Sequence, residues 1–478
     1  MGLSKGHLGA RAAVLASALL VHAILIPASR IVPVQTARST ALADQVTDPQ
    51  DLEKDQGYLD PAPGGMDVRY AWAQNGGRGQ NVKIIDIENN WNLDHNDLRS
   101  ATSNLLIYQK GFDSDPADDI DHGTAVLGEI VAANDGVGVT GIASSAQLGL
   151  INPQSSASTN DLSAAVSKAA SVLGPGDVIL IEQQVIGPRF DVRTGQGIVP
   201  PEFDGSVFQA IRDATSRGIV VVEPASNGSE NLDDPIYAGV FNRAIQDSGA
   251  IMVAAGMPPE GVYGPGPDRT PAATTDYGSR IDVQGWGDSI ATCGYGDLRR
   301  DQGQNSLFTG RFGGTSGASA MVAGAAALIE SITKAAHRPP LSPIALRQLL
   351  VSSGTPQAGN TGQHIGPRPN LQAAIVALGS GTGALVPVIR AVSYNDNKNR
   401  LIVDGADFIP GDSVVEINGQ QVSRIKYPAG YIQVDGTTSR IMTKGDITTL
   451  LPLGVTVEIT VLNRTLGTRS DPFAFMRQ

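Results

Sequence analysis

The sequence predicts an α/β fold built on a mostly parallel sheet, followed by a small all-β sandwich. Short and almost wholly apolar runs at 177–181 and 218–222 are typical of strands buried on both faces of a parallel sheet. Segments with apolar residues at helical spacing, at 161–173 and 206–217, alternate with these runs. Beyond residue 386 only short strand-like runs and turns occur, which is typical of a β-sandwich.

The remaining elements of the first unit follow the same alternation. A β-rich run at 82–87 ends in a carboxylate, and 122–133 is apolar at helical spacing. Residues 251–255 form another buried-strand candidate, and 315–337 predict a long helix rich in Ala and Gly. We expect this unit to cover 58–380, with a Gly/Ser/Thr linker at 381–386.

The sandwich is expected to cover 387–478. Its predicted strands are the apolar runs at 386–392, 400–403, 413–417, 431–434 and 455–461. Turn residues such as Pro410-Gly411 and Asn418-Gly419 separate them.

Composition and charge limit the function classes. The chain has 478 residues, is 41% hydrophobic and carries a net charge of -12, so it is an ordinary globular protein and no general nucleic-acid binder. Its one cysteine, Cys293, excludes intrachain disulfides and cysteine-rich metal sites. The negative charge lies before residue 381, where 25 Lys and Arg face 38 Asp and Glu. The two units are therefore expected to have different surfaces.

The N-terminus predicts export. Residues 1–43 contain no acidic side chain, and Lys5 and Arg11 precede an apolar run at 12–27. This pattern is typical of a secretory signal, and the run is short for a membrane span of about 20 residues. Cleavage is expected after Ala41-Leu42-Ala43 or nearer Ala28, with a retained membrane anchor as the alternative. Secretion, the periplasm or the cell surface is the expected location, and residues 44–57 form a polar tether.

Two residues at predicted helix starts are candidates for catalysis. His122 lies in Asp121-His122-Gly123-Thr124, where small neighbours let another segment approach; the alternative is a capping or surface histidine. Ser316 opens the Ala-rich helix, where unpaired backbone N–H groups and the helix dipole favour a developing oxyanion. The alternative for Ser316 is an ordinary N-cap.

Two further candidates lie at strand ends. Asp86 ends a buried strand, which is where α/β folds place functional groups, although a structural turn aspartate has the same pattern. Asn227 follows another strand, and its amide is positioned to donate into a site at the same edge of the sheet. Asn-Gly is also a common turn.

The order of these four motifs resembles that of the subtilisin-like serine peptidases, over about 58–378. The motifs are Ile84-Ile85-Asp86, Asp121-His122-Gly123-Thr124, Ala225-Ser226-Asn227 and Gly314-Thr315-Ser316-Gly317-Ala318-Ser319-Ala320. The resemblance implies a subtilisin-like three-layer fold and a serine endopeptidase that acts on proteins or peptides through an acyl-enzyme, without a required cofactor.

The resemblance also implies the residue roles. Ser316 would attack the scissile carbonyl, His122 would move the proton, and Asp86 would orient His122. Asn227 and the Ser316 N–H would bind the oxyanion.

Several positions depart from the family pattern. Gly317, Ala320 and Ser226 stand where the family usually has other residues, although these sites only flank the chemistry. At the strand end that forms one wall of the substrate pocket in the family, we expect Glu182 or Gln183 to contact the substrate. A paired, structural Glu182 is the alternative. Between the leader and Tyr58 there is little room for the usual propeptide.

Two features concern ions and partners. The acidic run of Asp113, Asp115, Asp118, Asp119 and Asp121 is dense enough to bind a structural Ca²⁺, with a solvated loop as the alternative. The tail resembles bacterial Ig-like domains of the IPT/TIG type, on Val403-Asp404-Gly405-Ala406-Asp407-Phe408, Ile417-Asn418-Gly419 and Pro472-Phe473-Ala474-Phe475. Such a module would contact another protein or the cell surface, or act as a spacer.

Three functions remain open on the sequence alone. The first is an active exported serine endopeptidase. The second is a catalytically weak or inactive binding protein on a peptidase scaffold, acting through its tail. The third is a sedolisin-like acid peptidase that uses a glutamate as its base.

Overall fold

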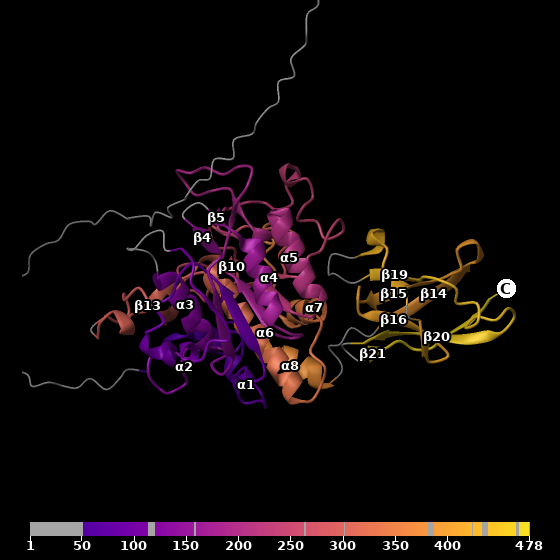
Figure 1. The fold of residues 1–478 in the computed structure, drawn as a ribbon, viewed down its shortest axis with the longest axis horizontal. Helices are drawn as coiled ribbons and strands as arrows, with labels where there is room; N and C mark the ends of the chain where they lie inside the picture. Colours follow the sequence, from indigo (N-terminus) through magenta and orange to yellow (C-terminus); the bar gives the residue numbers. More distant parts are fainter. Residues whose placement is uncertain are drawn as a thin grey trace, which may run out of the picture.

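The computed structural model describes residues 51–477 except 113–119, 157–158, 262–263, 301, 381–386, 423, 433–437 and 465–467. The expected leader at 1–43, the linker at 381–386 and most of the acidic run before His122 lie outside the described residues. Figure 1 shows a larger α/β unit and a smaller β unit beside it, next to the end that carries α7 (Pro343–Ser353) and α8 (Leu371–Ser380).

The larger unit is built on a seven-stranded sheet in the order β11-β10-β9-β6-β1-β3-β2, and every neighbouring pair is parallel. Its strands are β1 (Lys83–Ile87), β2 (Tyr108–Gln109), β3 (Gln147–Ile151), β6 (Val178–Ile181), β9 (Val220–Pro224), β10 (Ile251–Gly256) and β11 (Val283–Trp286). The predicted parallel sheet is therefore confirmed. Because the strands are parallel, their carboxyl ends meet at one edge.

Strand alternation divides the core into two layers. Ile84 and Leu180 pack on one face with α3 (Ile120–Val131) and α6 (Gly314–Ala335). Ile85 and Ile179 pack on the other face with α4 (Leu162–Val172) and α5 (Gly205–Ser216). Figure 1 shows these helices on the sheet, which gives the three layers expected of the fold.

Helix α6 lies in the centre of the larger layer. Its Ala-rich face packs closely on β10 and β11, and Ser316 lies in its first turn. Among the described residues, α6 is the one helix long and apolar enough to cross a membrane, and 94% of its most apolar window is buried inside the protein. It is therefore a core helix.

The remaining elements of this unit are short. They are α1 (Val68–Trp72), α2 (Arg99–Thr102), β4 (Gln154–Ser156), β5 (Thr159–Asn160), β7 (Val185–Ile186), β8 (Ile198–Val199), β12 (Ile290–Cys293) and β13 (Phe308–Phe312). The end of the expected tether also belongs to the unit. Leu52 is buried with its N–H donating to Gly138, and the Gln56 side chain is buried and bonded to Thr140. Leu52, Gln56 and Gly57 are thus packed against the unit, while Asp51 and Lys54 are exposed.

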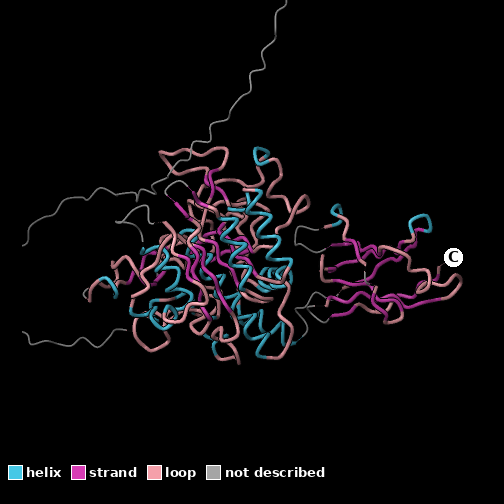
Figure 2. The backbone as a smooth tube through the Cα atoms, viewed as in Figure 1, coloured by secondary structure: helices cyan, strands magenta, loops and turns pink. Residues whose placement is uncertain are grey.

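The tail consists of two antiparallel sheets that enclose a separate apolar core around Val403, Phe408 and Val415. One sheet has the order β14-β15-β19-β18, and the other has the order β17-β16-β20-β21 with β22 also paired to β20. The strands are β14 (Val388–Asn395), β15 (Arg400–Phe408), β16 (Ser413–Ile417), β17 (Gln420–Gln421), β18 (Ile425–Lys426), β19 (Thr438–Thr443), β20 (Thr456–Asn463), β21 (Thr468–Arg469) and β22 (Phe473–Met476). Figure 2 shows the tail as strands and loops with little helix, as a β-sandwich requires.

One predicted tail strand differs. Residues 429–431 form a short 3₁₀ turn after Pro428, and Ile432 makes a single β-bridge. The rest of the predicted run, 433–434, lies outside the described residues.

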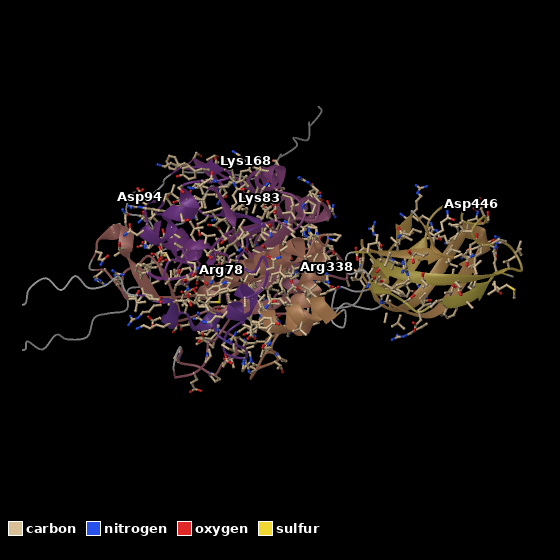
Figure 3. All side chains as sticks on the ribbon, turned by 90° about the horizontal axis from the view of Figure 1, so that it is seen from below. Arg78, Lys83, Asp94, Lys168, Arg338 and Asp446 are labelled. Atoms are coloured by element: carbon tan, nitrogen blue, oxygen red, sulfur yellow. The ribbon has the colours of Figure 1, made fainter. Side chains whose placement is uncertain are left out.

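Figure 3 shows Arg338 at the edge of the larger unit nearest the tail and Asp446 on the tail itself.

Candidate active site

Several polar residues that the sequence singles out converge at the carboxyl edge of the sheet, together with Glu88, which is not predicted from the sequence. Chain segments leaving β1, β6 and β9 carry Glu88, Glu182 and Asn227 there. His122 and Ser316 come from the first turns of α3 and α6, on the layer above. Sheets of this kind bind ligands outside the carboxyl ends of their strands. The topology therefore assembles one site from five segments.

His122 lies between a carboxylate and a hydroxyl. Its Nδ1 is 2.6 Å from Oε2 of Glu88, and its Nε2 is 3.1 Å from Oγ of Ser316. The ring also packs edge-on against Phe312, with centroids 5.5 Å apart. Ser316 is 8% exposed, so its hydroxyl is shielded but reachable. A carboxylate, an imidazole and a serine hydroxyl in this chain of contacts form the arrangement that activates a serine nucleophile.

The carboxylate bonded to Nδ1 of His122 is Glu88, where the sequence predicts Asp86. Asp86 is fully buried, and its Oδ2 accepts a hydrogen bond of 2.8 Å from the Trp91 indole N–H. Burial raises the pKa of Asp86 well above its ordinary value, and the neighbouring Glu88 adds to the rise. A carboxyl group with a raised pKa favours its neutral form, which is poorly suited to stabilise an imidazolium.

The physical reason lies in the geometry of the strand end. Asp86 belongs to β1, and Glu88 follows its last residue, Ile87, with an N–H that still donates to Ile151, so the backbone keeps both side chains on the same side. The longer side chain of Glu88 reaches Nδ1 of His122. Its other oxygen, Oε1, accepts the N–H of Asn89 at 2.6 Å, which fixes the carboxylate. The sequence signal available for Glu88 was its spacing: Asp86 and Glu88 are two carboxylates, two residues apart, at the end of a predicted strand.

Further buried carboxyl groups surround the pair. Glu182 is 6% exposed, and burial raises its pKa well above the ordinary value, with Asp86 and Glu88 adding to the rise and Ser316 opposing it. Glu129 on α3 is fully buried, and burial raises its pKa in the same direction. The site therefore holds several carboxyl groups whose pKa is raised by burial.

The expected oxyanion donors lie at the start of α6. Asn227 accepts the Thr315 N–H on its Oδ1 at 3.1 Å, while its amide nitrogen donates to Gln184. The Ser316 N–H belongs to the first turn of α6, where backbone donors lack partners within the helix. The structure thus brings Asn227 next to the helix start that carries Ser316.

The two expected substrate-contacting residues are buried instead. Gln183 is 8% exposed and bonds Asn89 and Asn160, and Glu182 is enclosed as described above. The next residue, Gln184, is exposed and contacts Ser226 and Asn227. Sequence reasoning missed Gln184, because no motif marks a glutamine in a loop.

One group of donors in the described part of the chain has the geometry of a metal site. Ligand atoms of Glu88, His122 and Glu182 lie within 4.8 Å of one another. A cation there would take a nitrogen lone pair of His122 that the serine chemistry needs. Cys293 is buried beneath the site, and burial raises the pKa of its thiol well above the ordinary value, so it is a packing residue.

A family model described as "Subtilase family" matches residues 77–366, which is more than half of the chain. The chain belongs to the subtilase family. The α/β unit is thus a serine protease domain of the subtilase fold, and proteins or peptides are its substrates as a class. The tail lies outside the matched residues.

The chain is also similar to a curated protein and to solved structures. An "Intracellular serine protease" of Paenibacillus polymyxa is 25% identical over 320 residues, which cover 64% of this chain and 85% of the relative. A protease structure from Pseudoalteromonas arctica is 23% identical, covers 69% of this chain and 99% of its own, and has a TM-score of 0.49. The prenylagaramide maturation protease PagA is 18% identical, covers 65% and 97%, and has a TM-score of 0.47.

Proposed function

We propose that the protein is an exported serine endopeptidase with a Ser316–His122–Glu88 triad. The observation that carries this proposal is the position of His122, 2.6 Å from Glu88 and 3.1 Å from Ser316. In the proposal, Glu88 takes the role that the sequence suggested for Asp86. The family assignment supports the reaction class, and the contacts support the choice of residues.

The proposed reaction runs in two halves. His122 Nε2 takes the proton of Ser316 Oγ as the oxygen attacks the carbonyl carbon of the substrate, and Glu88 stabilises the imidazolium. The carbonyl oxygen becomes an oxyanion, which accepts from the Asn227 amide and the Ser316 N–H. His122 then gives the proton to the leaving amine, and the acyl-enzyme remains on Ser316. In the second half, water attacks the acyl carbon while His122 takes its proton. His122 then returns the proton to Ser316 Oγ as the ester bond breaks, which releases the carboxylic acid product.

No metal or organic cofactor enters these steps, because His122 moves the proton and N–H donors stabilise the charge.

Export is proposed from the basic and apolar leader at 1–43. N-terminal sequencing of the protein from the culture medium and from washed cells tests it. Protein found only inside cells with an intact N-terminus would contradict export. A structural Ca²⁺ at 113–121 is proposed only from the acidic sequence.

The tail is proposed as a contact module for another protein or the cell surface. Its near balance of ten Lys and Arg against nine Asp and Glu gives it a surface unlike that of the acidic catalytic unit. Deletion of 387–478 should leave peptide hydrolysis intact and remove binding to cells. Retained cell binding would contradict the proposal.

A fluorophosphonate probe tests the proposed function directly, because it reacts only with an activated serine. The folded wild type should be labelled, and Ser316→Ala and His122→Ala should not. Ser103→Ala, an exposed serine on the surface, is the matched control and should label as the wild type does. Absence of labelling in folded wild type would favour the binding-protein alternative. Labelling and hydrolysis that survive His122→Ala at strongly acidic pH would favour the acid-peptidase alternative.

A further inference from the structure

Gln184 joins two chain segments at the edge of the site. It lies in the connection between β6 and β7, while Ser226 and Asn227 follow β9, the strand paired to β6. Its Oε1 accepts three donors: Ser226 Oγ at 2.7 Å, the Asn227 N–H at 2.7 Å and Asn227 Nδ2 at 3.3 Å. A single exposed side chain thus holds both the backbone and the amide of Asn227.

The backbone at this point needs such support. Ser226 has φ +88°, a left-handed conformation that residues with a side chain rarely adopt. It is fully buried, and its hydroxyl is satisfied by Gln184. The Ser226 conformation sets the direction in which the next residue, Asn227, leaves the strand. The bond from Ser226 to Gln184 therefore stabilises the turn that places Asn227 beside the start of α6.

The Asn227 amide is held at both ends. Its Oδ1 accepts the Thr315 N–H at 3.1 Å, so its rotation is fixed from the side of α6. Its Nδ2 carries two hydrogens, and one of them is directed at Gln184. Because the amide group is planar, the direction of its second N–H is then fixed as well. Donors that are already oriented stabilise an oxyanion without reorganisation during the reaction.

We infer that Gln184 is a positioning residue for the oxyanion hole: it orients Asn227 through the backbone and the amide together. This inference rests on the proposed serine protease function and adds to it a residue that acts only through Asn227. Because the ground-state carbonyl needs this donor less than the oxyanion does, loss of Gln184 should lower kcat and leave KM nearly unchanged.

The test compares Gln184→Ala and Gln184→Met on a peptide substrate. Methionine keeps the length of the side chain but supplies no comparable acceptor, so both variants should lose kcat by about tenfold. This is less than the roughly 10²–10³-fold that removal of an oxyanion donor costs, because Asn227 remains present. Gln196→Ala, an exposed glutamine before β8, is the matched control and should keep the wild-type kcat. Thermal unfolding of each variant shows whether it is folded.

A double-mutant cycle with Asn227→Ala decides between positioning and a general structural role. If Gln184 acts through Asn227, its substitution should cost nothing further once Asn227 is alanine. A peptide aldehyde, which forms an oxyanion on Ser316, should bind the Gln184 variants weaker by the same factor as their loss of kcat. Unchanged kcat in both variants, or a full additional loss in the double variant, would overturn the inference. Failure of the proposed function gives a different result, because the wild type would then neither cleave the peptide nor react with the fluorophosphonate.

Discussion

Glu88 Oε2 lies 2.6 Å from Nδ1 of His122, while Asp86, two residues earlier in β1, is bonded to Trp91. The two carboxyl groups are neighbours at the end of β1 but have different surroundings. Glu88 has the imidazole and a backbone N–H as partners. Asp86 is enclosed, and burial raises its pKa. The pair therefore divides into one carboxylate that orients the base and one acid that supports the fold.

Substitution of these two residues should give unequal effects. Glu88→Ala should lower kcat by roughly 10³–10⁴-fold, the order of loss when a triad carboxylate is removed, because His122 loses its orientation and its counter-charge. Asp86→Asn keeps the size of a neutral acid and should lower kcat by less than about tenfold, since the neutral form is already favoured. Steady-state kinetics on one peptide measure both. A reversed order, with Asp86→Asn inactive and Glu88→Ala active, would restore the assignment made from the sequence.

The difference between these residues shows what the sequence could predict. The strand, its polar end and the neighbouring histidine follow from local pattern, because buried parallel strands and helix starts have strong signals. The choice between Asp86 and Glu88 depends on which side chain reaches His122 across the gap between β1 and α3. That distance is set by the packing of α3 and α6 on the sheet, which no local pattern records.

Glu182 and Gln184 show the same limit. The sequence marked the end of β6 as unusual, but it could not tell which side chains turn inward. The strand end buries Glu182 and leaves Gln184 exposed, so the contact with Asn227 depends on how the segments after β6 and β9 face each other.

In the tail, 413–417 was predicted correctly because it is apolar, whereas 431–434 follows Pro428 and begins in a 3₁₀ turn.

Chelation should not slow the chemical step. The proposed reaction uses His122 for the proton and N–H donors for the oxyanion, so EDTA added with excess Ca²⁺, which keeps the proposed structural Ca²⁺ in place, should leave the initial rate of fluorophosphonate labelling unchanged. Added Zn²⁺ should inhibit reversibly, because Glu88, His122 and Glu182 offer ligand atoms within 4.8 Å of one another and imidazole and carboxylate are Zn²⁺ ligands. A rate that falls in EDTA and returns with Zn²⁺ would contradict the metal-free reaction.

Glu330 should make the stability of the catalytic unit depend on pH. It lies buried on α6, where burial raises the pKa of its carboxyl to about 8, and its Oε2 accepts the Leu341 N–H. The folded state keeps the proton up to about pH 8, whereas the unfolded chain releases it near the ordinary value of 4.5. The folded state then binds more protons between these values, so this contribution to stability is present at acidic pH and is lost as pH rises from about 4.5 to 8.

Glu330→Gln removes the titrating group at nearly constant volume. Urea unfolding of the wild type and the variant is measured at pH 5 and pH 7.5. The free energy of unfolding of the variant, relative to that of the wild type, should be higher at pH 7.5 than at pH 5 by on the order of 1 kcal/mol or more. Glu260→Gln, at an exposed position, is the matched control and should show no such gain. A constant difference between Glu330→Gln and the wild type at both pH values would contradict the assignment.

Arg280 anchors a buried ionic network on which the catalytic unit should depend strongly. It is 1% exposed, with Nε 2.6 Å from Glu202 Oε1 and Nη1 2.9 Å from Asp282 Oδ2. Burial has already cost these groups their hydration, so removal of the cation leaves the buried Glu202 and Glu223 without the arginine, whereas Asp282 keeps its contacts with Arg243 and Arg347. Arg280→Met should therefore lower the free energy of unfolding by about 3–5 kcal/mol.

The exposed Arg193–Asp191 pair provides the control for this prediction. The Arg193 side chain is 84% exposed and its contact with Asp191 is 3.0 Å, so water and salt screen the charge. Arg193→Met should cost less than about 1 kcal/mol. Chemical denaturation of both variants at one pH compares them directly. Equal losses would mean that the Arg280 network is stabilised by its surroundings rather than by the arginine itself. The expected gap between the two follows from burial, because the two arginines carry the same charge and make contacts of similar length.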